Sequence, residues 1–154
     1  MSVGKSLSSG TADPYDLQRF VDAQDGVYDT VLAELRAGRK RSHWIWFVFP
    51  QLAALGRSPT ARRFGISSLG EAQAYLQHEL LGARLRECAR LVAAIDGRSA
   101  DDIFGWPDNL KVRSSMTLFA RAADDPDTRA DFIAVLDAFY DGAEDPLTVE
   151  QLAR

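Results

Sequence analysis

Two stretches of the sequence combine side chains that could bind or act on a small molecule. One is residues 39–51, RKRSHWIWFVFPQ, and the other is residues 106–116, WPDNLKVRSSM. In the second stretch, Asp108, Lys111 and Ser114 are spaced three residues apart, so on a helix they lie along one surface. A carboxylate, an ammonium group and a hydroxyl on one edge can hold a ligand hydroxyl or orient a water molecule for attack. We therefore treat both stretches as candidate walls of one site.

Three residues are candidates for catalysis: His43, Asp108 and Lys111. His43 follows three cations and is expected at the first turn of a helix, where the helix dipole and the neighbouring charges favour the neutral imidazole. A neutral imidazole can act as a base or donate a hydrogen bond. The alternative for His43 is a hydrogen bond to the backbone at the helix start. For Asp108 and Lys111 the alternative is a capping network with a surface ion pair, which contributes little stability.

Eight residues are candidates for ligand binding. His78 stands with Arg84 near the start of a strongly amphipathic helix, and the other seven are candidates for three reasons. A buried amide or hydroxyl needs a hydrogen-bond partner, an indole ring can stack on a ligand, and a guanidinium group can pair with a phosphate or carboxylate. Ordinary packing, capping and exposure on the surface are the alternatives. The candidates are Gln24, Arg39, Trp46, Gln51, His78, Arg84, Ser114 and Ser115.

The sequence lacks the standard signatures of cofactor chemistry. It has no phosphate-binding glycine loop, no dinucleotide fingerprint and no nucleophile elbow. With two histidines and one cysteine it also lacks the ligands of a structural zinc site. The cysteine, Cys88, falls on an apolar helical stripe, which favours a place in the core. We therefore expect neither a metal nor a cofactor.

Charge is distributed unevenly along the chain, whose net charge is −4. Residues 36–63 contain seven Lys and Arg and no Asp or Glu, whereas acidic residues outnumber basic ones after residue 70. A basic segment on an acidic protein favours a small anionic ligand over a long nucleic acid, which needs a broad positive surface. The other interpretation is a solvated basic surface. Neither interpretation indicates an oligomeric state.

The composition, with 46% apolar and 26% charged residues, is that of an ordinary globular domain. The longest apolar run, residues 44–49, is far too short to span a membrane. Residues 1–12 lack the apolar run of a signal peptide, and their Ser and Gly content predicts a flexible N-terminal tail. Together with the single cysteine, these features predict one domain over residues 13–154 in the cytoplasm.

Helix signals follow one another through this domain. An apolar stripe from Leu17 to Leu35 predicts one long helix over residues 14–37, with Asp13 as its N-cap. Ser58, Ser68 and Ser99 are typical N-cap residues. Further helices are expected over residues 58–64, 68–77, 81–95, 99–104, 112–119 and 128–140. The prediction is an all-α fold, a single compact domain of about six to eight helices.

The residue pattern of the central segment, residues 42–49, fits two types of secondary structure. Its apolar residues do not alternate with polar ones, a pattern that fits a buried strand or a buried helix. The β-propensity of its residues favours a strand, whereas the helical surroundings and Ser42 as a possible N-cap favour a helix. We predict a short buried helix that ends near Pro50.

The same stretches resemble a known bacterial family. Residues 42–51, SHWIWFVFPQ, and residues 111–119, KVRSSMTLF, carry its most specific motifs. The family is the domain-of-unknown-function family 1810 (DUF1810), often labelled calpastatin, and the resemblance covers nearly the whole chain after residue 13. It implies a compact multihelical fold and no established activity. The chain departs from the family where Glu79 replaces the usual proline after His78 and where Asn109 replaces a usual aspartate.

A second, shorter similarity links the chain to another family. Residues 20–24 have an aromatic-x-x-Ala-Gln pattern, Gly38-Arg39 precedes the tryptophan segment, and Lys111 precedes a methionine. These patterns are similar to those of the NADAR family of ADP-ribose-linked N-glycosidases. The similarity implies a nucleotide-sugar ligand.

Two functions from different classes are consistent with this sequence. In the first, a polar and aromatic pocket binds or hydrolyses a nucleotide- or ADP-ribose-type ligand without a metal. Hydrolysis of an N-glycosidic bond would use Asp108 to stabilise positive charge or orient water, and His43 or Lys111 to assist the leaving group. In the second, the protein is a non-catalytic interaction module whose residues 36–63 bind an acidic protein partner. Polar groups converging on a cavity would favour the first function.

Overall fold

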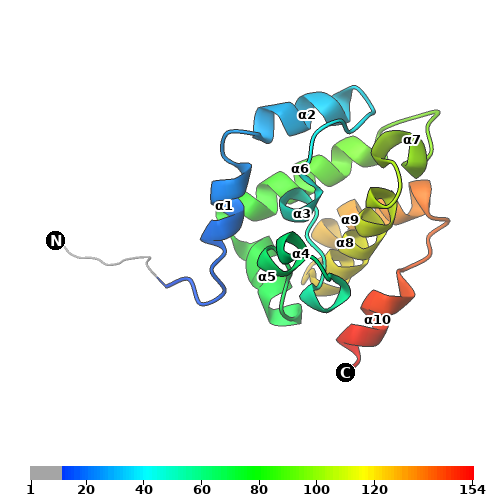
Figure 1. Cartoon of the computed structure of the whole chain (residues 1–154). Coiled ribbons are helices and arrows are strands. Elements are labelled where there is room, and N and C mark those ends of the chain that lie inside the picture. The colour runs from blue at the N-terminus through cyan, green and yellow to red at the C-terminus, as the bar shows by residue number, and fades with distance from the viewer. Residues whose placement is uncertain (1–11) are drawn as a thin grey trace.

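The computed structural model describes residues 12–154, and this part of the chain is all-α, as predicted (Figure 1). The predicted tail, residues 1–12, lies outside the described residues except for Ala12. The expected number of helices is too low: the described residues form ten α-helices, three of them with only four or five residues, and one 3₁₀ helix, η1. The elements are α1 (Gln18–Gln24), α2 (Tyr28–Arg36), α3 (Ile45–Val48), η1 (Ala53–Leu55), α4 (Pro59–Arg63), α5 (Leu69–Gln77), α6 (Glu79–Ala93), α7 (Ala100–Phe104), α8 (Asp108–Ala122), α9 (Pro126–Phe139) and α10 (Pro146–Leu152).

The core forms where α5, α6, α8 and α9 pack together, with α9 against both α6 and α8 (Figure 1). A row of aromatic rings crosses it. The ring of Phe20 in α1 lies 5.1 Å from that of Tyr75 in α5, Tyr75 lies 5.2 Å from Phe119 in α8, and Phe119 lies 6.0 Å from Phe132 in α9. Rings at these centroid separations attract one another beyond their burial. The row therefore joins four helices from both halves of the chain.

The helix predicted over residues 14–37 is in fact two helices. α1 and α2 are separated by a turn in which Gly26 has a φ of +86°. Glycine adopts this left-handed conformation without steric cost and so ends the helix. The prediction of Asp13 as the N-cap is wrong, since Leu17 holds that position at the start of α1. The Asp13 carboxylate nevertheless accepts hydrogen bonds from the N–H groups of Leu17, at 2.8 Å, and Gln18, at 3.0 Å. The apolar stripe continues across the turn, so periodicity alone did not reveal the break.

The central segment, residues 42–49, contains a helix, as predicted, but α3 is only four residues long. Ser42 does not cap it, contrary to the prediction, because its hydroxyl donates to the Glu34 carboxylate at 2.6 Å. After α3 the chain is extended, and Leu52 forms an isolated parallel β-bridge with Ile66. Packing of its buried inner face, and not capping, therefore holds α3 in place.

The N-caps predicted at Ser58, Ser68 and Ser99 are confirmed, since each hydroxyl accepts a hydrogen bond from the backbone three residues ahead. His78 marks the predicted break between α5 and α6. Its Nδ1 accepts hydrogen bonds at 3.2 Å from two N–H groups in the first turn of α6. The carboxylate of Glu71, three residues after Ser68, accepts a hydrogen bond from the N–H of Ser67.

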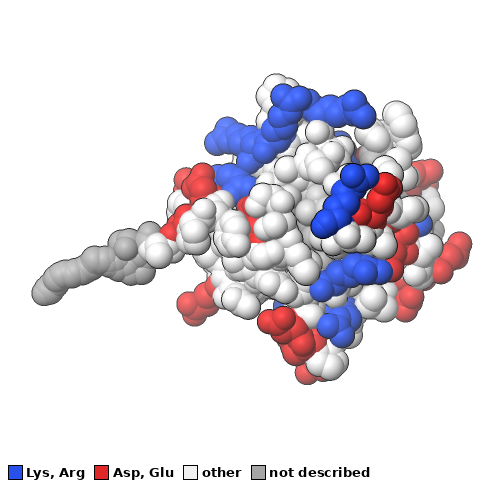
Figure 2. Space-filling model, turned by 90° about the horizontal axis from the view of Figure 1, so that it is seen from below, with Lys and Arg blue, Asp and Glu red and all other residues white. Residues whose placement is uncertain are grey.

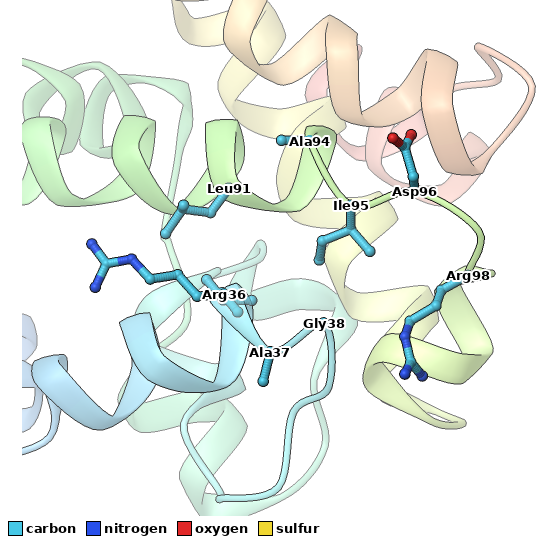
Figure 3. Close-up of a pocket in the computed structure, with 9 residues that line it drawn as sticks. Arg36, Ala37, Gly38, Leu91, Ala94, Ile95, Asp96 and Arg98 are labelled. Atoms are coloured by element: carbon cyan, nitrogen blue, oxygen red, sulfur yellow. The ribbon is translucent and has the colours of Figure 1, made fainter.

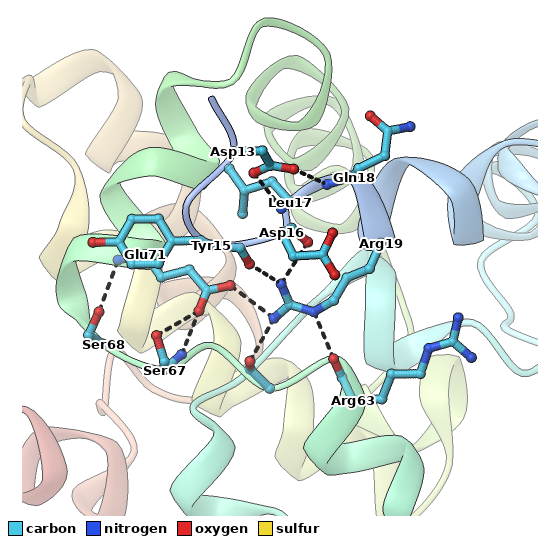
Figure 4. A network of polar contacts seen from close by, with 11 residues as sticks. Asp13, Tyr15, Asp16, Leu17, Gln18, Arg19, Arg63, Ser67, Ser68 and Glu71 are labelled. Carbon is cyan, nitrogen blue, oxygen red and sulfur yellow. Dashed lines mark hydrogen bonds and ion pairs between the residues drawn. The ribbon is translucent and has the colours of Figure 1, made fainter. Parts of the chain in front are cut away.

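Glu71 belongs to a polar network around Arg19 (Figure 4). The Arg19 guanidinium pairs with Glu71 Oε2 at 2.9 Å, and Glu71 Oε1 accepts from the N–H and the hydroxyl of Ser67, each at 2.8 Å. The Arg19 and Glu71 side chains are only 14% and 3% exposed. Arg19 also donates to four backbone carbonyls, those of Tyr15, Asp16, Arg63 and Gly65. The network ties the segment before α1 to the connection between α4 and α5.

Candidate ligand-binding site

Asp108 lies between two lysine side chains that come from different parts of the chain. Lys111, one turn further along α8, places its Nζ 3.1 Å from Asp108 Oδ1. Lys40, in the loop between α2 and α3, places its Nζ 2.8 Å from Asp108 Oδ2. The side chains of Lys40, Asp108 and Lys111 are 7%, 19% and 19% exposed. The structure confirms that Asp108 and Lys111 are neighbours, and it adds a second cation, so two positive charges share one negative charge.

Two tryptophan rings lie against these ammonium groups. Lys111 Nζ is 3.9 Å from the ring centroid of Trp46, and Lys40 Nζ is 5.3 Å from that of Trp44. The electron-rich face of an indole attracts a cation at such distances. Trp44 is buried and Trp46 is half-buried. The central segment therefore supplies the rings that fix both lysines.

The environment of Asp108 keeps its carboxylate ionised. Partial burial acts to raise the pKa of Asp108, but the hydrogen bonds and charges of Lys40 and Lys111 outweigh it, and the pKa lies below its usual value. Its place in the first turn of α8 acts in the same direction, since a helix N-terminus favours negative charge. Because a carboxylate with a low pKa and two occupied oxygens is a weak base, this geometry suits Asp108 to positioning the lysines.

A buried carboxylate, Glu34 of α2, holds the loop that carries Lys40. Glu34 Oε1 accepts hydrogen bonds from the N–H groups of Arg41, at 2.6 Å, and Ser42, at 3.0 Å, and from Trp44 Nε1, at 2.9 Å. Burial alone would raise the pKa of Glu34, but these hydrogen bonds and the one from the Ser42 hydroxyl lower it to about 2. The N–H of Lys40 also donates to a carbonyl of α7 at 2.7 Å. The position of Lys40 is therefore set by buried hydrogen bonds on both sides.

Lys111 forms part of the wall of a pocket of about 260 Å³ between α8, the start of α10 and the segment that follows α3. Gln51 and Ser114, both predicted from the sequence, line the same pocket, together with Asp145. Asp108 and Trp46 do not line the pocket, but both contact the ammonium group of Lys111. The remaining lining residues are Leu55, Pro107, Leu110, Arg113 and Leu147.

The two serines of α8 have different surroundings. Ser114 Oγ lies 3.0 Å from Asp145 Oδ2 and 3.2 Å from the carbonyl of Leu110, so it ties α8 to the start of α10 while lining the pocket. Ser115 is fully buried, and its Oγ has no hydrogen-bond partner among residues 12–154. It follows Lys111 by four residues and so lies on the same side of α8. An unpaired buried hydroxyl is rare in folded proteins, so the Ser115 hydroxyl remains a candidate for ligand contact.

One family model and one solved structure match this chain. A family model described as a protein of unknown function (DUF1810) matches residues 14–152. The chain belongs to the DUF1810 family. It is also similar to a solved structure, the conserved hypothetical protein Rv1873 from Mycobacterium tuberculosis, with 63% identity, a TM-score of 0.89 and coverage of 92% of this chain and 99% of that one. No match to a curated protein was found.

Two of the predicted ligand-binding residues of this DUF1810 chain, Gln24 and Arg84, lie in a second cluster. Gln24 is buried, and its Nε2 donates to the carbonyl of Phe47, at 2.7 Å, and to the Tyr75 hydroxyl, at 3.1 Å. Its Oε1 accepts from Arg84 at 3.3 Å, and Arg84 also pairs with Asp25 at 3.3 Å. The buried amide thus has the partners that burial requires, and the cluster joins α1, α5 and α6.

Three more predicted residues lie apart from the pocket that Lys111 lines. His43 is exposed and precedes α3, so the expectation that it sits in the first turn of a helix is wrong. Arg39 is exposed, and its backbone N–H donates to a carbonyl of α2. His78 caps α6. The DUF1810 fold therefore gathers Trp46, Gln51, Asp108, Lys111 and Ser114 but leaves these three elsewhere.

Sequence reasoning missed two residues that organise the site. Lys40 lies between two arginines, and no local pattern distinguishes it from them. Glu34 did carry a signal, because with Val31 and Leu35 it occupies the i, i+3, i+4 positions of the buried stripe of α2. A carboxylate in an apolar stripe is almost never buried without partners, so its position alone indicated a network.

A larger pocket of this DUF1810 fold, of about 390 Å³, lies where the C-terminal ends of α2 and α6 meet (Figure 3). Its apolar lining residues include Leu91 and Ile95. The guanidinium groups of Arg36 and Arg98 point in different directions from its rim (Figure 3). The two arginines of this pocket therefore do not converge on one point.

Two further properties concern the described part of the DUF1810 chain. Among its His, Cys, Asp and Glu residues, no three are grouped closely enough to bind a metal ion. None of its helices combines the length and the apolar composition needed to cross a membrane.

Proposed function

We propose that this protein binds a small anionic ligand of nucleotide type in the pocket beside Lys111. The observation that carries the proposal is the charge balance at its wall: Lys40 and Lys111 share the single carboxylate of Asp108. One positive charge is therefore left without a full partner in a partly buried place, where charge is costly unless compensated. A phosphate or carboxylate at Lys111 would supply the missing negative charge.

The hydrogen-bonding capacity of Lys111 supports the same role. An ammonium group has three N–H donors. One of them is directed to Asp108 and the ring of Trp46 occupies another side, so a donor remains for the pocket. Gln51 and Ser114 line the pocket next to it and offer further polar contacts to the ligand.

Hydrolysis of an N-glycosidic bond is a second candidate function, favoured by the ionised state of Asp108. A ligand anion that draws Lys111 away would free Asp108 Oδ1. From its place next to the pocket, the freed carboxylate would stabilise through space the positive charge that develops on a sugar carbon as its bond to a base breaks; water would add to that carbon, and its proton would leave with the base. Analysis of the products after incubation with NAD or ADP-ribose tests this function separately from binding.

Binding is tested by thermal unfolding in the presence of ADP-ribose, NAD, nucleoside monophosphates and inorganic phosphate. A ligand that binds the folded protein raises Tm with concentration. Replacing Lys111 with alanine should weaken binding by about tenfold or more, because a charge-assisted hydrogen bond is lost. Asp108→Asn removes the negative charge that competes with the ligand for both lysines and should therefore raise the affinity for the anion. The exposed Arg90→Ala provides the control, and unchanged binding by Lys111→Ala would disprove the proposal.

The alternative function, an interaction module for an acidic partner, is favoured by one observation. Of the cations in residues 36–63 only Lys40 pairs with a carboxylate of the described residues. The others are exposed: Arg36, Arg39, Arg41, Arg57, Arg62 and Arg63. Figure 2 shows Lys and Arg on one face in several separate groups, some beside acidic residues, and not in one continuous surface. Such groups suit local acidic contacts, and binding to poly-glutamate that survives Lys111→Ala would favour this function.

A further inference from the structure

The pocket beside Lys111 is edged by apolar side chains that are exposed to solvent. Leu110 of α8 is 49% exposed and Leu147 of α10 is 59% exposed, and both line this pocket. Trp106, which is 78% exposed, directly precedes Pro107, another lining residue. Only seven large apolar residues are exposed in residues 12–154, so three of them occur at or next to one pocket. Apolar side chains gathered at a polar pocket are typical of a binding site, whereas single exposed ones are not.

The pocket is lined by both a cationic side chain and apolar ones. Lys111 carries the positive charge that shares Asp108 with Lys40. Leu110 and Leu147 come from two different helices and have no polar groups to offer. A ligand that satisfies both kinds of side chain must therefore have an anionic end and an apolar end.

The volume of the pocket, about 260 Å³, limits the size of this ligand. Pockets for drug-sized molecules usually measure about 300–1,000 Å³. A molecule with one ring and one anionic group suits the smaller space, whereas a dinucleotide would extend well beyond it. The volume of the pocket therefore favours a ligand with one ring over NAD and other dinucleotides.

We infer that the ligand of this pocket is a compact organic anion whose single phosphate or carboxylate meets Lys111 and whose one apolar ring lies against Leu110 and Leu147. The inference rests on the proposed function and narrows it to a class of ligand. Within the nucleotide type it selects a monophosphate carrying one base or ring system over a dinucleotide. The leucines are then specificity-determining residues, and the lysine is the anchor.

The test compares phenyl phosphate, inorganic phosphate and ADP-ribose by calorimetric titration of the full-length protein. Phenyl phosphate should bind about tenfold more tightly than inorganic phosphate, the ratio expected from removing about 60 Å² of apolar surface from water. Leu110→Ser combined with Leu147→Ser should abolish this preference, so that phenyl phosphate binds no more tightly than inorganic phosphate. Leu80→Ser, an exposed leucine of α6 away from the pocket, is the matched control and should keep the preference.

The outcomes separate this inference from the proposed function. Equal affinities for phenyl phosphate and inorganic phosphate, both lost in Lys111→Ala, would overturn the apolar end of the ligand and leave the anion site standing. The same would follow if Leu80→Ser acted like the pocket variants. Tighter binding of ADP-ribose than of phenyl phosphate would overturn the limit on ligand size. Binding of phosphate that persists in Lys111→Ala, or no binding by any probe, would overturn both.

Discussion

Replacing Glu34 with alanine is expected to lower the free energy of unfolding by about 3–5 kcal/mol, because several buried donors would lose a charged acceptor at once. The donors are two backbone N–H groups, the Trp44 indole and the Ser42 hydroxyl. Chemical denaturation at pH 7 measures the change. Glu150→Ala removes an exposed carboxylate of α10 and should change stability by less than about 0.5 kcal/mol. A similar small effect for Glu34→Ala would contradict the role of this network.

The same residue predicts a dependence of stability on pH. The pKa of Glu34 is lowered from 4.5 to about 2 in the folded protein, so the folded state favours the ionised form. Its stabilising contribution is complete above pH 4.5 and is lost as the pH falls towards 2. Glu34→Gln cannot titrate. The difference in unfolding free energy between the wild type and Glu34→Gln should therefore be constant near neutrality and shrink between these two pH values.

Loss of the Glu34 carboxylate should also weaken ligand binding. Its hydrogen bonds hold the backbone immediately after Lys40, and Lys40 shares Asp108 with Lys111. When the loop relaxes, Asp108 is left with one lysine, and Lys111 is drawn more strongly to it and away from the pocket. Ligand affinity should fall in Glu34→Gln even at temperatures where the protein remains folded, which separates this effect from unfolding.

The local parts of the fold were predictable because their causes are local. Ser58, Ser68 and Ser99 cap helices through bonds that span three residues, and any short window of sequence contains both partners. The break at Gly26 was missed because the apolar stripe continues through it, and only the backbone angle distinguishes a turn from a helical glycine. Ser42 was assigned the wrong partner because Glu34, eight residues earlier, competes for its hydroxyl.

The candidate site follows the same division. Asp108 and Lys111 share one helix, so their spacing was sufficient to pair them. Lys40 reaches Asp108 from a loop far away in the sequence, and no spacing rule connects the two. Leu147 joins the pocket only because α10 packs beside α8, a contact between distant segments. The sequence therefore could not indicate which residues from outside α8 line or support the pocket.

Arg19→Ala is the second substitution with a large expected effect, a loss of about 3–5 kcal/mol in unfolding free energy. Removing one partner of a buried ion pair leaves the other charge uncompensated, and breaking such a pair costs about this much. Here the stranded group is the Glu71 carboxylate, 3% exposed, which would keep only its hydrogen bonds from Ser67. Four backbone carbonyls would each lose a hydrogen bond in addition.

The matched control for this substitution is Arg121→Ala. Arg121 is also paired with a glutamate, and it forms two bonds to Glu144, but these side chains are 44% and 36% exposed, so the change should be about 0–1 kcal/mol. Arg19→Lys should destabilise nearly as much as alanine, since one ammonium group cannot serve acceptors spread around a planar guanidinium. Comparable losses for Arg19→Ala and Arg121→Ala in urea denaturation would show that charge alone matters. A far larger loss for Arg19→Ala would show that burial and the five simultaneous acceptors set its contribution.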